Sequence, residues 1–553
     1  MDLFRGSSMQ KLKSDFINYL AKTYDQQPYF SNVFPWSAPG YLRAGAYLYG
    51  INTAPVTRAR ILELGCAAGG NCIPIASLYP EVQLVGVDIS ANQIAMGKRV
   101  IKAMGLTNIQ LIHGCFSQLP KSLGQFDYII AHGVWSWIPK AAQSALLRVC
   151  QNFLAPKGLA YISFNTYPGW KLQEVFRDAM LFHGQQHKEQ EQVARAREML
   201  SFFQQGLATE NPMHATIKAQ AEKVPEGPEN DYYIAHEYLE LHNHPIYLKD
   251  FVRQLDAFGL AYVGDAEARN ELPSRYGAKF AQYFNLFTQG QSNLARQQYL
   301  DFAIGRQFRK ALIMHRDSIS EEAPAVDLSR LSHLQFAGWF EQEGQNLNAY
   351  QQPVVSFYRN LQDKKLRITE PLHDLWLNYL HESWPRPVSG QDLLRLAKAQ
   401  HPELEIERLK EQLKLMYLNV PLNLCRSYED LPPCLHDLSQ GLIPGIAALI
   451  TARHQQQTEP IEISDFNAWF QSSTAVFDDV ELLMIQGLDK NTPIPKLVWQ
   501  LVQHMEQATP GSQTPNQVKQ ATKIHSCGET STQWAEQKID AFIAHLRKYA
   551  LYI

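Results

Sequence analysis

The sequence predicts an α/β protein that opens with a doubly wound parallel sheet and continues into two further regions. Three observations carry this prediction. Short apolar runs alternate with helical patterns between residues 60 and 165, a glycine-rich turn follows the first run, and strand signals fade after residue 170. The 553 residues have room for three or four domains of about 150 residues each.

The predicted strands come first, as five runs of apolar and β-branched residues. They span 59–65, 82–89, 109–116, 126–134 and 158–165. Residues 90–106 and 140–158 between them have helical spacing, and the second segment ends at the helix-stop residues Pro156 and Gly158. Near-continuous apolar strands that alternate with helices indicate a parallel, Rossmann-like sheet covered on both faces.

The rest of the chain is predicted to be mostly helical. Residues 171–225, 233–260 and 293–313 have helical patterns, whereas 340–553 has mixed periodicity. We therefore expect three domains: the sheet domain over 1–185, a helical middle domain over 186–330 and a C-terminal domain over 331–553.

The amino-acid composition indicates which kind of binding partner and which cellular compartment to expect. Lys and Arg number 51 against 54 Asp and Glu, so no basic excess favours a nucleic-acid partner. Seven Cys without any Cys-x-x-Cys pair argue against a disulfide framework or zinc ribbon, and they fit the reducing cytoplasm. We expect no signal peptide and no membrane span, because no apolar stretch is long enough.

A metal site is also not expected. His236, His242 and His244 cluster in the sequence, but Glu240 occupies the position where a second histidine ligand would follow His236 on a helix. We interpret these histidines as structural. Arg306 and Arg309, three residues apart on a predicted helix, are interpreted as ion-pair partners at a domain interface.

The segment that indicates chemistry is ELGCAAGGN, residues 63–71, directly after the first strand. Gly65 and Gly69 allow a sharp turn and a close approach of the backbone to a ligand. Asp88 ends the next strand, 23 residues after Gly65. In doubly wound folds an acidic residue at this place accepts hydrogen bonds from ribose hydroxyls.

The spacing of the turn favours a nucleoside without phosphates. The dinucleotide fingerprint needs glycine at its second position, where Ala67 stands, and no P-loop motif occurs. Glu63, beside the glycines, would repel phosphate oxygens. It suits a ligand with a cationic head, such as S-adenosylmethionine.

The same segments resemble a known family. ELGCAAGGN, GVDIS, GCF and LAPKGLAYIS are similar to the motifs of class I S-adenosylmethionine-dependent methyltransferases. AHGVWSWIP, SFNTYPGW and HEYLE resemble the members that carry a methyltransferase regulatory domain, which include rickettsial protein-lysine methyltransferases of an outer membrane protein. The resemblance covers about residues 30–310. The last 200 residues loosely resemble the winged-helix-like C-terminal domain of that group.

The resemblance implies a set of cofactor-binding residues. Glu63, Gly65, Gly69 and Asn71 would hold the methionine moiety, and Asp88 and Ile89 the ribose and adenine. Cys115 and Phe116 would cap the adenine, with His132 and Gly133 under the methyl group. Cys115 stands where many relatives have Asp, and NTYPGW follows the fifth strand rather than the fourth, unlike the Asn-Pro-Pro-Tyr motif of amino methyltransferases.

Aromatic residues cluster at the predicted binding edge of the sheet. Trp135 and Trp137 follow the fourth strand, and Tyr167 and Trp170 follow the fifth, at the edge where ligands bind in such folds. Two interpretations stand for these four aromatics: they pack in the core, or they line a channel for the methyl acceptor. Tyr29 and Phe34, before the first strand, are expected to close over the cofactor. We take His132, Trp137 and Tyr167 as the catalytic candidates.

The function that these expectations favour is protein-lysine N-methylation by in-line transfer, with S-adenosyl-L-homocysteine as the product. Two domains beyond the sheet suggest a macromolecular acceptor, and the charge balance favours protein over nucleic acid; a homodimer is a further option. The alternatives are a small-molecule or tRNA methyltransferase and a non-catalytic regulatory protein that binds S-adenosylmethionine. Residues 331–553 are expected to serve acceptor turnover and not cofactor binding.

Overall fold

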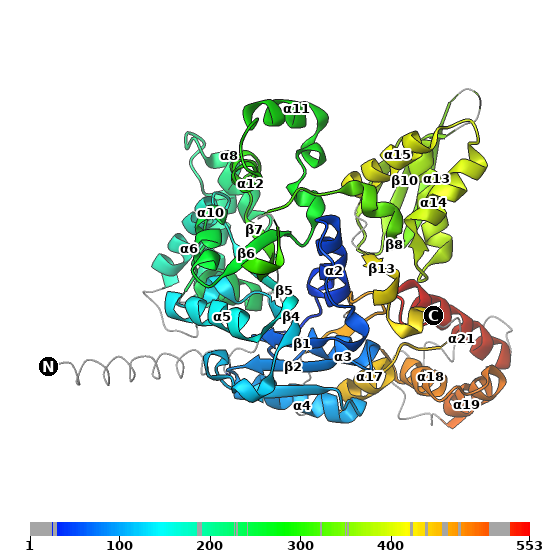
Figure 1. Ribbon diagram of the computed structural model, residues 1–553. Coiled ribbons are helices and arrows are strands. Elements are labelled where there is room, and N and C mark those ends of the chain that lie inside the picture. The colour runs from blue at the N-terminus through cyan, green and yellow to red at the C-terminus, as the bar shows by residue number, and fades with distance from the viewer. Residues whose placement is uncertain are drawn as a thin grey trace.

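The computed structural model contains a seven-stranded mixed sheet at its centre (Figure 1). It describes residues 25, 30–184, 191–225, 227, 231–240, 242–320, 323–348, 350, 353–420, 424–436, 441–455, 463–473, 477–507 and 531–553. The strands run in the order β3-β2-β1-β4-β5-β7-β6. Their bounds are β1 Arg60–Leu64, β2 Gln83–Asp88, β3 Ile109–His113, β4 Phe126–Ala131, β5 Leu154–Asn165, β6 Leu260–Asp265 and β7 Phe308–His315.

The first five strands are parallel and confirm the predicted doubly wound sheet. Successive residues of a strand point to opposite faces, so Ile61 joins the core under one face and Leu62 the core under the other. The first face is covered by α2 Pro39–Leu48, α3 Cys72–Leu78 and α4 Ala91–Met104. The second is covered by α5 Lys140–Phe153 and α10 Leu248–Asp256. Two buried faces explain the near-continuous apolar strands.

Strand β7 corrects the helical interpretation of 293–313, and β6 lies in the part of the chain where no further strands were expected. Helix α12 Asn293–Ile304 ends at Gly305, which has a left-handed φ of 61°. The following residues form β7, which pairs antiparallel with both β5 and β6. The sheet thus takes its last two strands from the segment 186–330. The domain boundaries themselves stay a prediction.

A small helical region packs beside this edge of the sheet. Its helices are α6 Trp170–Gly184, α7 Gln192–Gln205, α8 His214–Ala221 and α9 Asp231–Ile234, followed by a π-helix over Ala235–Leu239. They share a separate core of buried side chains, among them Phe176, Met180, Leu200, Phe203 and Ile234. Helix α11 Ala278–Phe287 projects away from the sheet (Figure 1).

The C-terminal region combines short sheets with helices. One sheet has the order β12-β8-β13, from Val388–Ser389, Leu334–Ala337 and Leu424–Ser427, and the antiparallel strands β9 Phe340–Leu347, β10 Pro353–Asn360 and β11 Lys365–Ile368 form another. The helices that pack with them are α13 Pro371–Ser383, α14 Gly390–Gln400 and α15 Ile406–Asn419. The winged-helix assignment stays a prediction.

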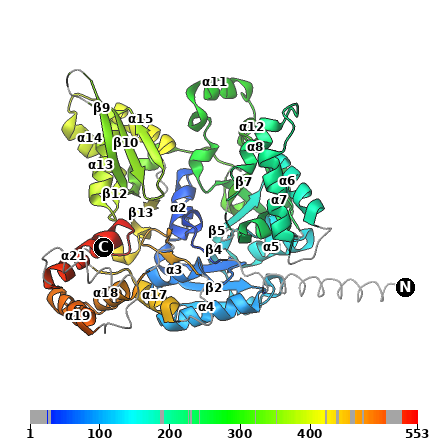
Figure 2. The same ribbon diagram turned by 180° about the vertical axis from the view of Figure 1, so that it is seen from behind.

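The final part of the chain returns to the first domain. It comprises α16 Pro433–His436, α17 Ile446–Gln455, the two-residue strands β14 Asp465–Phe466 and β15 Ser472–Ser473, and the helices α18 Asp479–Asp489, α19 Ile494–Gln507 and α21 Ser531–Lys548. Helix α17 packs on α4, as both views show (Figure 2). The Tyr79 hydroxyl donates to the carbonyl of Asp430 at 2.6 Å, and the Asp430 carboxylate pairs with Arg43 at 2.7 Å. The C-terminal region therefore shares one core with the α2–α4 face of the sheet.

The described helices include none with the length and apolar character that a membrane crossing requires. The described residues also contain no group of three or more His, Cys, Asp or Glu side chains placed to hold a metal ion.

Candidate functional site

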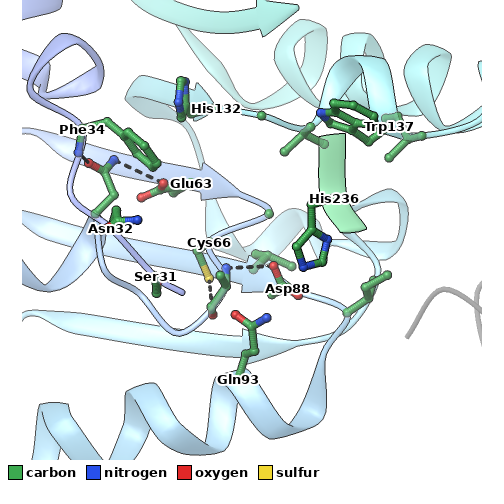
Figure 3. A pocket seen from close by; sticks show the side chains of 18 of the residues that line it. Ser31, Asn32, Phe34, Glu63, Cys66, Asp88, Gln93, His132, Trp137 and His236 are labelled. Atoms are coloured by element: carbon green, nitrogen blue, oxygen red, sulfur yellow. Dashed lines mark hydrogen bonds between the residues drawn. The ribbon is translucent and has the colours of Figure 1, made fainter. Parts of the chain in front are cut away.

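A cavity of about 260 Å³ opens at the carboxyl ends of β1, β2, β3 and β4 (Figure 3). Its floor comes from the loops after these strands, and two other segments wall it. One is the extended segment of residues 31–34, which precedes α2 and which we call the N-terminal strap. The other is the stretch 236–240, which we call the acidic wall. Ligands bind at this edge of parallel α/β sheets.

The loop after β1 is shaped by residues with left-handed backbone. Gly65 and Gly69 have φ of +73° and +85°. A Cβ on Gly65 would lie 2.6 Å from the side chain of Val134, so this position has no room for any larger residue. Gly65 lines the cavity, whereas Gly69 lies behind it and only shapes the turn.

Asp88 is fixed by backbone donors before it meets a ligand. Its Oδ2 accepts the Ala67 N–H at 2.8 Å, and its Oδ1 accepts the Ser90 N–H at 2.9 Å. Burial raises the pKa of this carboxyl, and the backbone donors oppose the rise. An ionised carboxylate has about four acceptor sites. The backbone donors use part of this capacity, and the rest can accept hydroxyl groups of a ligand in the cavity.

Glu63 lies at the bottom of the cavity and connects the loop to the N-terminal strap. Its carboxyl accepts the Cys72 thiol at 2.8 Å and the Asn71 amide at 3.2 Å. Burial raises the pKa of Glu63 to about 7, against the lowering effect of both donors. The Asn71 Oδ1 in turn accepts the backbone N–H of Phe34 at 3.2 Å. The glycine loop therefore holds the strap directly.

His132 and Gly133 lie just beyond β4, on the opposite wall from Asp88. The His132 Nδ1 is 3.0 Å from the Tyr161 hydroxyl and 3.1 Å from the Ser163 hydroxyl. Its ring packs 4.2 Å from the Phe34 ring, between centroids. Burial, with a smaller contribution from Lys310, lowers the pKa of His132 to about 3. The imidazole is therefore neutral near pH 7.

The acidic wall is one part of the site that the sequence did not predict, and Asn165 and Phe308 are others. His236, Glu237 and Glu240 line the cavity from the π-helix and its end, and His236 projects into it (Figure 3). We had interpreted HEYLE as structural. The sequence does show two acidic residues within four positions of His236. Nothing local in the sequence, however, indicates that they lie at the edge of the sheet.

Other lining residues add an apolar rim. Trp137 lines the cavity as predicted, together with Phe34 and Phe308 from distant parts of the chain. Trp135 instead packs in the core, 5.1 Å from the Phe251 ring. Of the four predicted aromatics after the fourth and fifth strands, Trp137 is thus the one that reaches the cavity.

Several predicted residues lie elsewhere. Tyr167 is outside the cavity lining, with its ring 5.2 Å from that of Tyr247 and the Lys171 ammonium 4.0 Å above it. Cys115 is also outside the lining, with its thiol 3.0 Å from the Ser117 hydroxyl, although its neighbour Phe116 lines the cavity. Tyr29 lies outside the described residues.

The shape and chemistry of the cavity fit an adenosine with a charged tail. Gly114 and Gly133 face it with positive φ, and a Cβ built on either would meet no atom within 4 Å, so their open space can receive a ligand. Asp88 offers acceptors for ribose hydroxyls, while Ile89 and Phe116 offer apolar surface for a base. Glu63 supplies a carboxyl group where a cationic head can bind.

Comparison with known proteins agrees with this geometry. Residues 61–158 match the methyltransferase domain, and residues 230–315 match the predicted methyltransferase regulatory domain. A protein of Rickettsia prowazekii is 31% identical over 396 residues, 70% of each chain. A second protein of that organism is 35% identical over 233 residues, which cover 42% of this chain and 93% of the relative.

Two solved structures share the fold over nearly the whole chain. PKMT2 from Rickettsia typhi superposes with a TM-score of 0.75 at 22% identity, covering 94% of this chain and 99% of that one. The structure of PKMT2 in complex with AdoHcy superposes with a TM-score of 0.74 at 21% identity, and the match covers 95% of this chain and 100% of that one. S-adenosylmethionine is the cofactor that these findings assign. The chain belongs to the S-adenosylmethionine-dependent methyltransferases that carry a methyltransferase regulatory domain.

Proposed function

We propose that this methyltransferase modifies lysine side chains of a protein. The observation that carries the proposal is the composition of the cavity lining, which includes Trp137, Phe308 and the acidic wall. Aromatic faces and carboxylates together suit a cationic amine. The likeness to the rickettsial protein-lysine methyltransferases supports the same acceptor.

A large acceptor also fits the exposed apolar surface of the segment that ends in β7. Phe308 lines the cavity and is 38% exposed. The helices that precede β7 in the chain expose further large apolar side chains, with Phe302 at 51% and Phe287 at 74%. Exposed apolar surface of this kind is typical of protein-binding surfaces. A small-molecule acceptor would not need it.

The proposed cofactor contacts follow the geometry. Asp88 would accept the ribose hydroxyls, Ile89 and Phe116 would flank the adenine, and Glu63 and Gly65 would meet the methionine end. Asn71 would act through Glu63 and Phe34. Bound S-adenosylmethionine supplies an electrophilic methyl group on a sulfonium.

The residues of the protein supply the rest of the catalytic effect. Alignment of acceptor and donor in a closed site is worth about 7–11 kcal/mol. A lysine with a pKa near 10.4 must also lose a proton, which costs roughly 4.6 kcal/mol at pH 7. The apolar rim of Trp137 and Phe308 reduces this cost by excluding water. His132, whose pKa is about 3, is a weak base, so its proposed role is to form the wall under the methyl group.

The test is methyl transfer from S-adenosylmethionine with a tritiated methyl group to a bacterial lysate and a panel of surface proteins, followed by mass spectrometry. Methylated lysines on one or a few proteins are expected. Transfer only to small amines or to tRNA would contradict the proposal and favour a small-molecule or tRNA methyltransferase. Cofactor binding without transfer to any of these acceptors would indicate a non-catalytic regulatory protein. A homodimer stays a prediction.

A further inference from the structure

The chain that follows the acidic wall is anchored to the loop after β4 and to the end of β5. The backbone N–H of His244 donates to the Ser136 carbonyl at 2.8 Å, and that of Ile246 donates to the Asn165 carbonyl at 3.1 Å. Ser136 follows β4 and Asn165 ends β5, so the chain after Glu240 runs along the two loops that carry Trp137 and Asn165. Both of these residues line the cavity.

The wall is also rigidly held from behind. The Arg177 guanidinium is buried and donates to the carbonyl of Tyr238 at 2.6 Å and to that of Glu240. A π-helix leaves backbone carbonyls without their usual partners, and single π-helical turns occur frequently at functional sites. Arg177 supplies donors to two carbonyls at the end of the π-helix and so holds the backbone next to Glu237 in place.

The three polar side chains of the wall differ in what they bind. His236 and Glu240 contact each other, with 3.0 Å between Nδ1 and Oε1. Glu237 lies between them in sequence and lines the cavity, and its carboxylate has no hydrogen bond or ion pair among the described residues. The fold thus places one half-buried carboxylate in the wall of the cavity, without a hydrogen bond or ion pair among the described residues.

We propose that Glu237 binds the ammonium of the incoming amine and accepts its proton. This inference rests on the proposed function and names the residue that prepares the acceptor. Glu237 takes one proton, which leaves a lone pair on the amine nitrogen. The new nitrogen–carbon bond forms as the sulfur–carbon bond breaks, and that electron pair stays on sulfur. The product is a methylammonium, and the proton on Glu237 passes to water.

The acidity of the two candidate bases agrees with this assignment. Burial raises the pKa of Glu237 to about 7, with a smaller opposite effect from His236. A general base works best when its pKa is near the pH of the reaction. His132, with a pKa of about 3, is far from that range.

The first test is independent of methyl transfer. Sinefungin is an analogue of S-adenosylmethionine in which a carbon bearing an amine replaces the methylsulfonium, so its ammonium marks the place of the reacting group. A hydrogen bond to a charged group contributes about 1.5–3 kcal/mol, which corresponds to a change in affinity of about tenfold or more. By calorimetry, Glu237→Gln should bind sinefungin about tenfold more weakly than wild type. It should keep its affinity for S-adenosylhomocysteine.

The second test uses lysine methylation by the full chain. Glu237→Gln should lower kcat and remove the rise of kcat near pH 7, while Glu237→Asp should restore part of the rate. Glu222→Gln is the matched control, because Glu222 is an exposed carboxylate at the end of α8. It should leave binding and rate unchanged.

The outcomes separate the two proposals. If lysines are methylated and Glu237→Gln keeps both its sinefungin affinity and its pH profile, Glu237 has no such role. Equal loss of both ligands in Glu237→Gln would also overturn it, since the residue would then serve cofactor binding. If wild type methylates no lysine but sinefungin affinity follows Glu237, the carboxylate binds an ammonium as proposed and the lysine assignment fails.

Discussion

Two carboxylates of the site, Asp88 and Glu63, are held in position by hydrogen bonds within the protein. Glu63 is buried and Asp88 is half-buried, and both accept hydrogen bonds from the chain itself. The difference lies in their donors. Asp88 is held by backbone N–H groups, whereas Glu63 is held by a thiol and an amide. Backbone donors keep Asp88 in place and leave part of its acceptor capacity for the ligand.

Replacing Asp88 by Ala should reduce the affinity for S-adenosylhomocysteine by about 10- to 150-fold, because hydrogen bonds to a charged group contribute about 1.5–3 kcal/mol. Isothermal titration calorimetry measures this change directly. Asp127→Ala is the control: Asp127 lies at the opposite end of β4 and accepts the Arg60 N–H at 2.8 Å. Unchanged affinity in Asp88→Ala would refute the assignment of this cavity to the cofactor.

The acidity of Glu63 gives a prediction about pH. Its pKa in the folded protein is about 7 and its ordinary value is 4.5, so the folded state holds the proton more tightly than the unfolded state. Stability should therefore fall as the pH rises from about 4.5 through 7, by up to about 3 kcal/mol from this group. Glu63→Gln should remove this slope in denaturant unfolding at pH 5.5 and 8. Glu81→Gln, at an exposed side chain, should retain it.

At the scale of elements, the antiparallel edge of the sheet depends on a buried charge cluster. Arg309 on β7 is fully buried and binds Asp301 on α12 through two nitrogens, at 2.9 and 2.8 Å. It also pairs with Glu271 at 3.1 Å. The expected ion pairing of Arg306 and Arg309 agrees with the contacts, since Arg306 also binds Asp301, at 2.6 Å. The helix expected to carry both is wrong, because α12 ends at Ile304 and Arg309 lies on β7. The cluster fixes α12 against β7.

Arg309→Leu should destabilise the protein by about 3–5 kcal/mol, because it leaves the buried Glu271 without its counter-charge and Asp301 with Arg306 alone. Denaturant unfolding followed by circular dichroism measures the loss. Arg253→Leu provides the comparison, since Arg253 is 76% exposed in its side chain and should change stability by less than about 0.5 kcal/mol. A similar small effect at both positions would show that the cluster contributes little.

The elements that the sequence predicted are those with local signals. The five parallel strands have continuous apolar runs, and the cofactor loop has glycines at a recognisable distance from Asp88. Strand β7 escaped prediction because FRKALI directly follows a helix, and its pairing with β5 is not encoded locally. The acidic wall escaped because Arg177, about 60 residues earlier in the chain, fixes its shape.

For the whole molecule, residues 331–553 contact one wall of the cofactor cavity. The backbone N–H of Ser464 donates to the Ser31 carbonyl at 3.0 Å, and the Ser464 hydroxyl accepts the Val33 N–H at 3.3 Å. The Ser31 hydroxyl in turn accepts the N–H of Gly70 in the glycine loop at 2.8 Å. The N-terminal strap therefore lies between the C-terminal region and the cofactor loop. We had expected the C-terminal region to leave cofactor binding to the first domain.

Ser464→Pro should therefore weaken the binding of S-adenosylhomocysteine by roughly threefold to tenfold, because proline removes the N–H that holds the strap and a hydrogen bond is worth about 0.5–1.5 kcal/mol. Calorimetry gives the affinity, and thermal unfolding without ligand shows whether the fold persists. Ser464→Ala keeps the N–H and should have a smaller effect. Wild-type affinity in the proline variant would mean that the strap stays in place without its C-terminal partner.

The contact between Ser464 and Val33 also has a consequence for biosynthesis, since it joins residues that are 431 positions apart. Ribosomes add about 5–20 residues per second, so the strap waits about 20–90 s for its partner to be translated. A nascent chain cannot complete its cofactor pocket during that interval. Truncated translation products should consequently lack the finished pocket, and methyl-group transfer should begin only with nearly full-length chains.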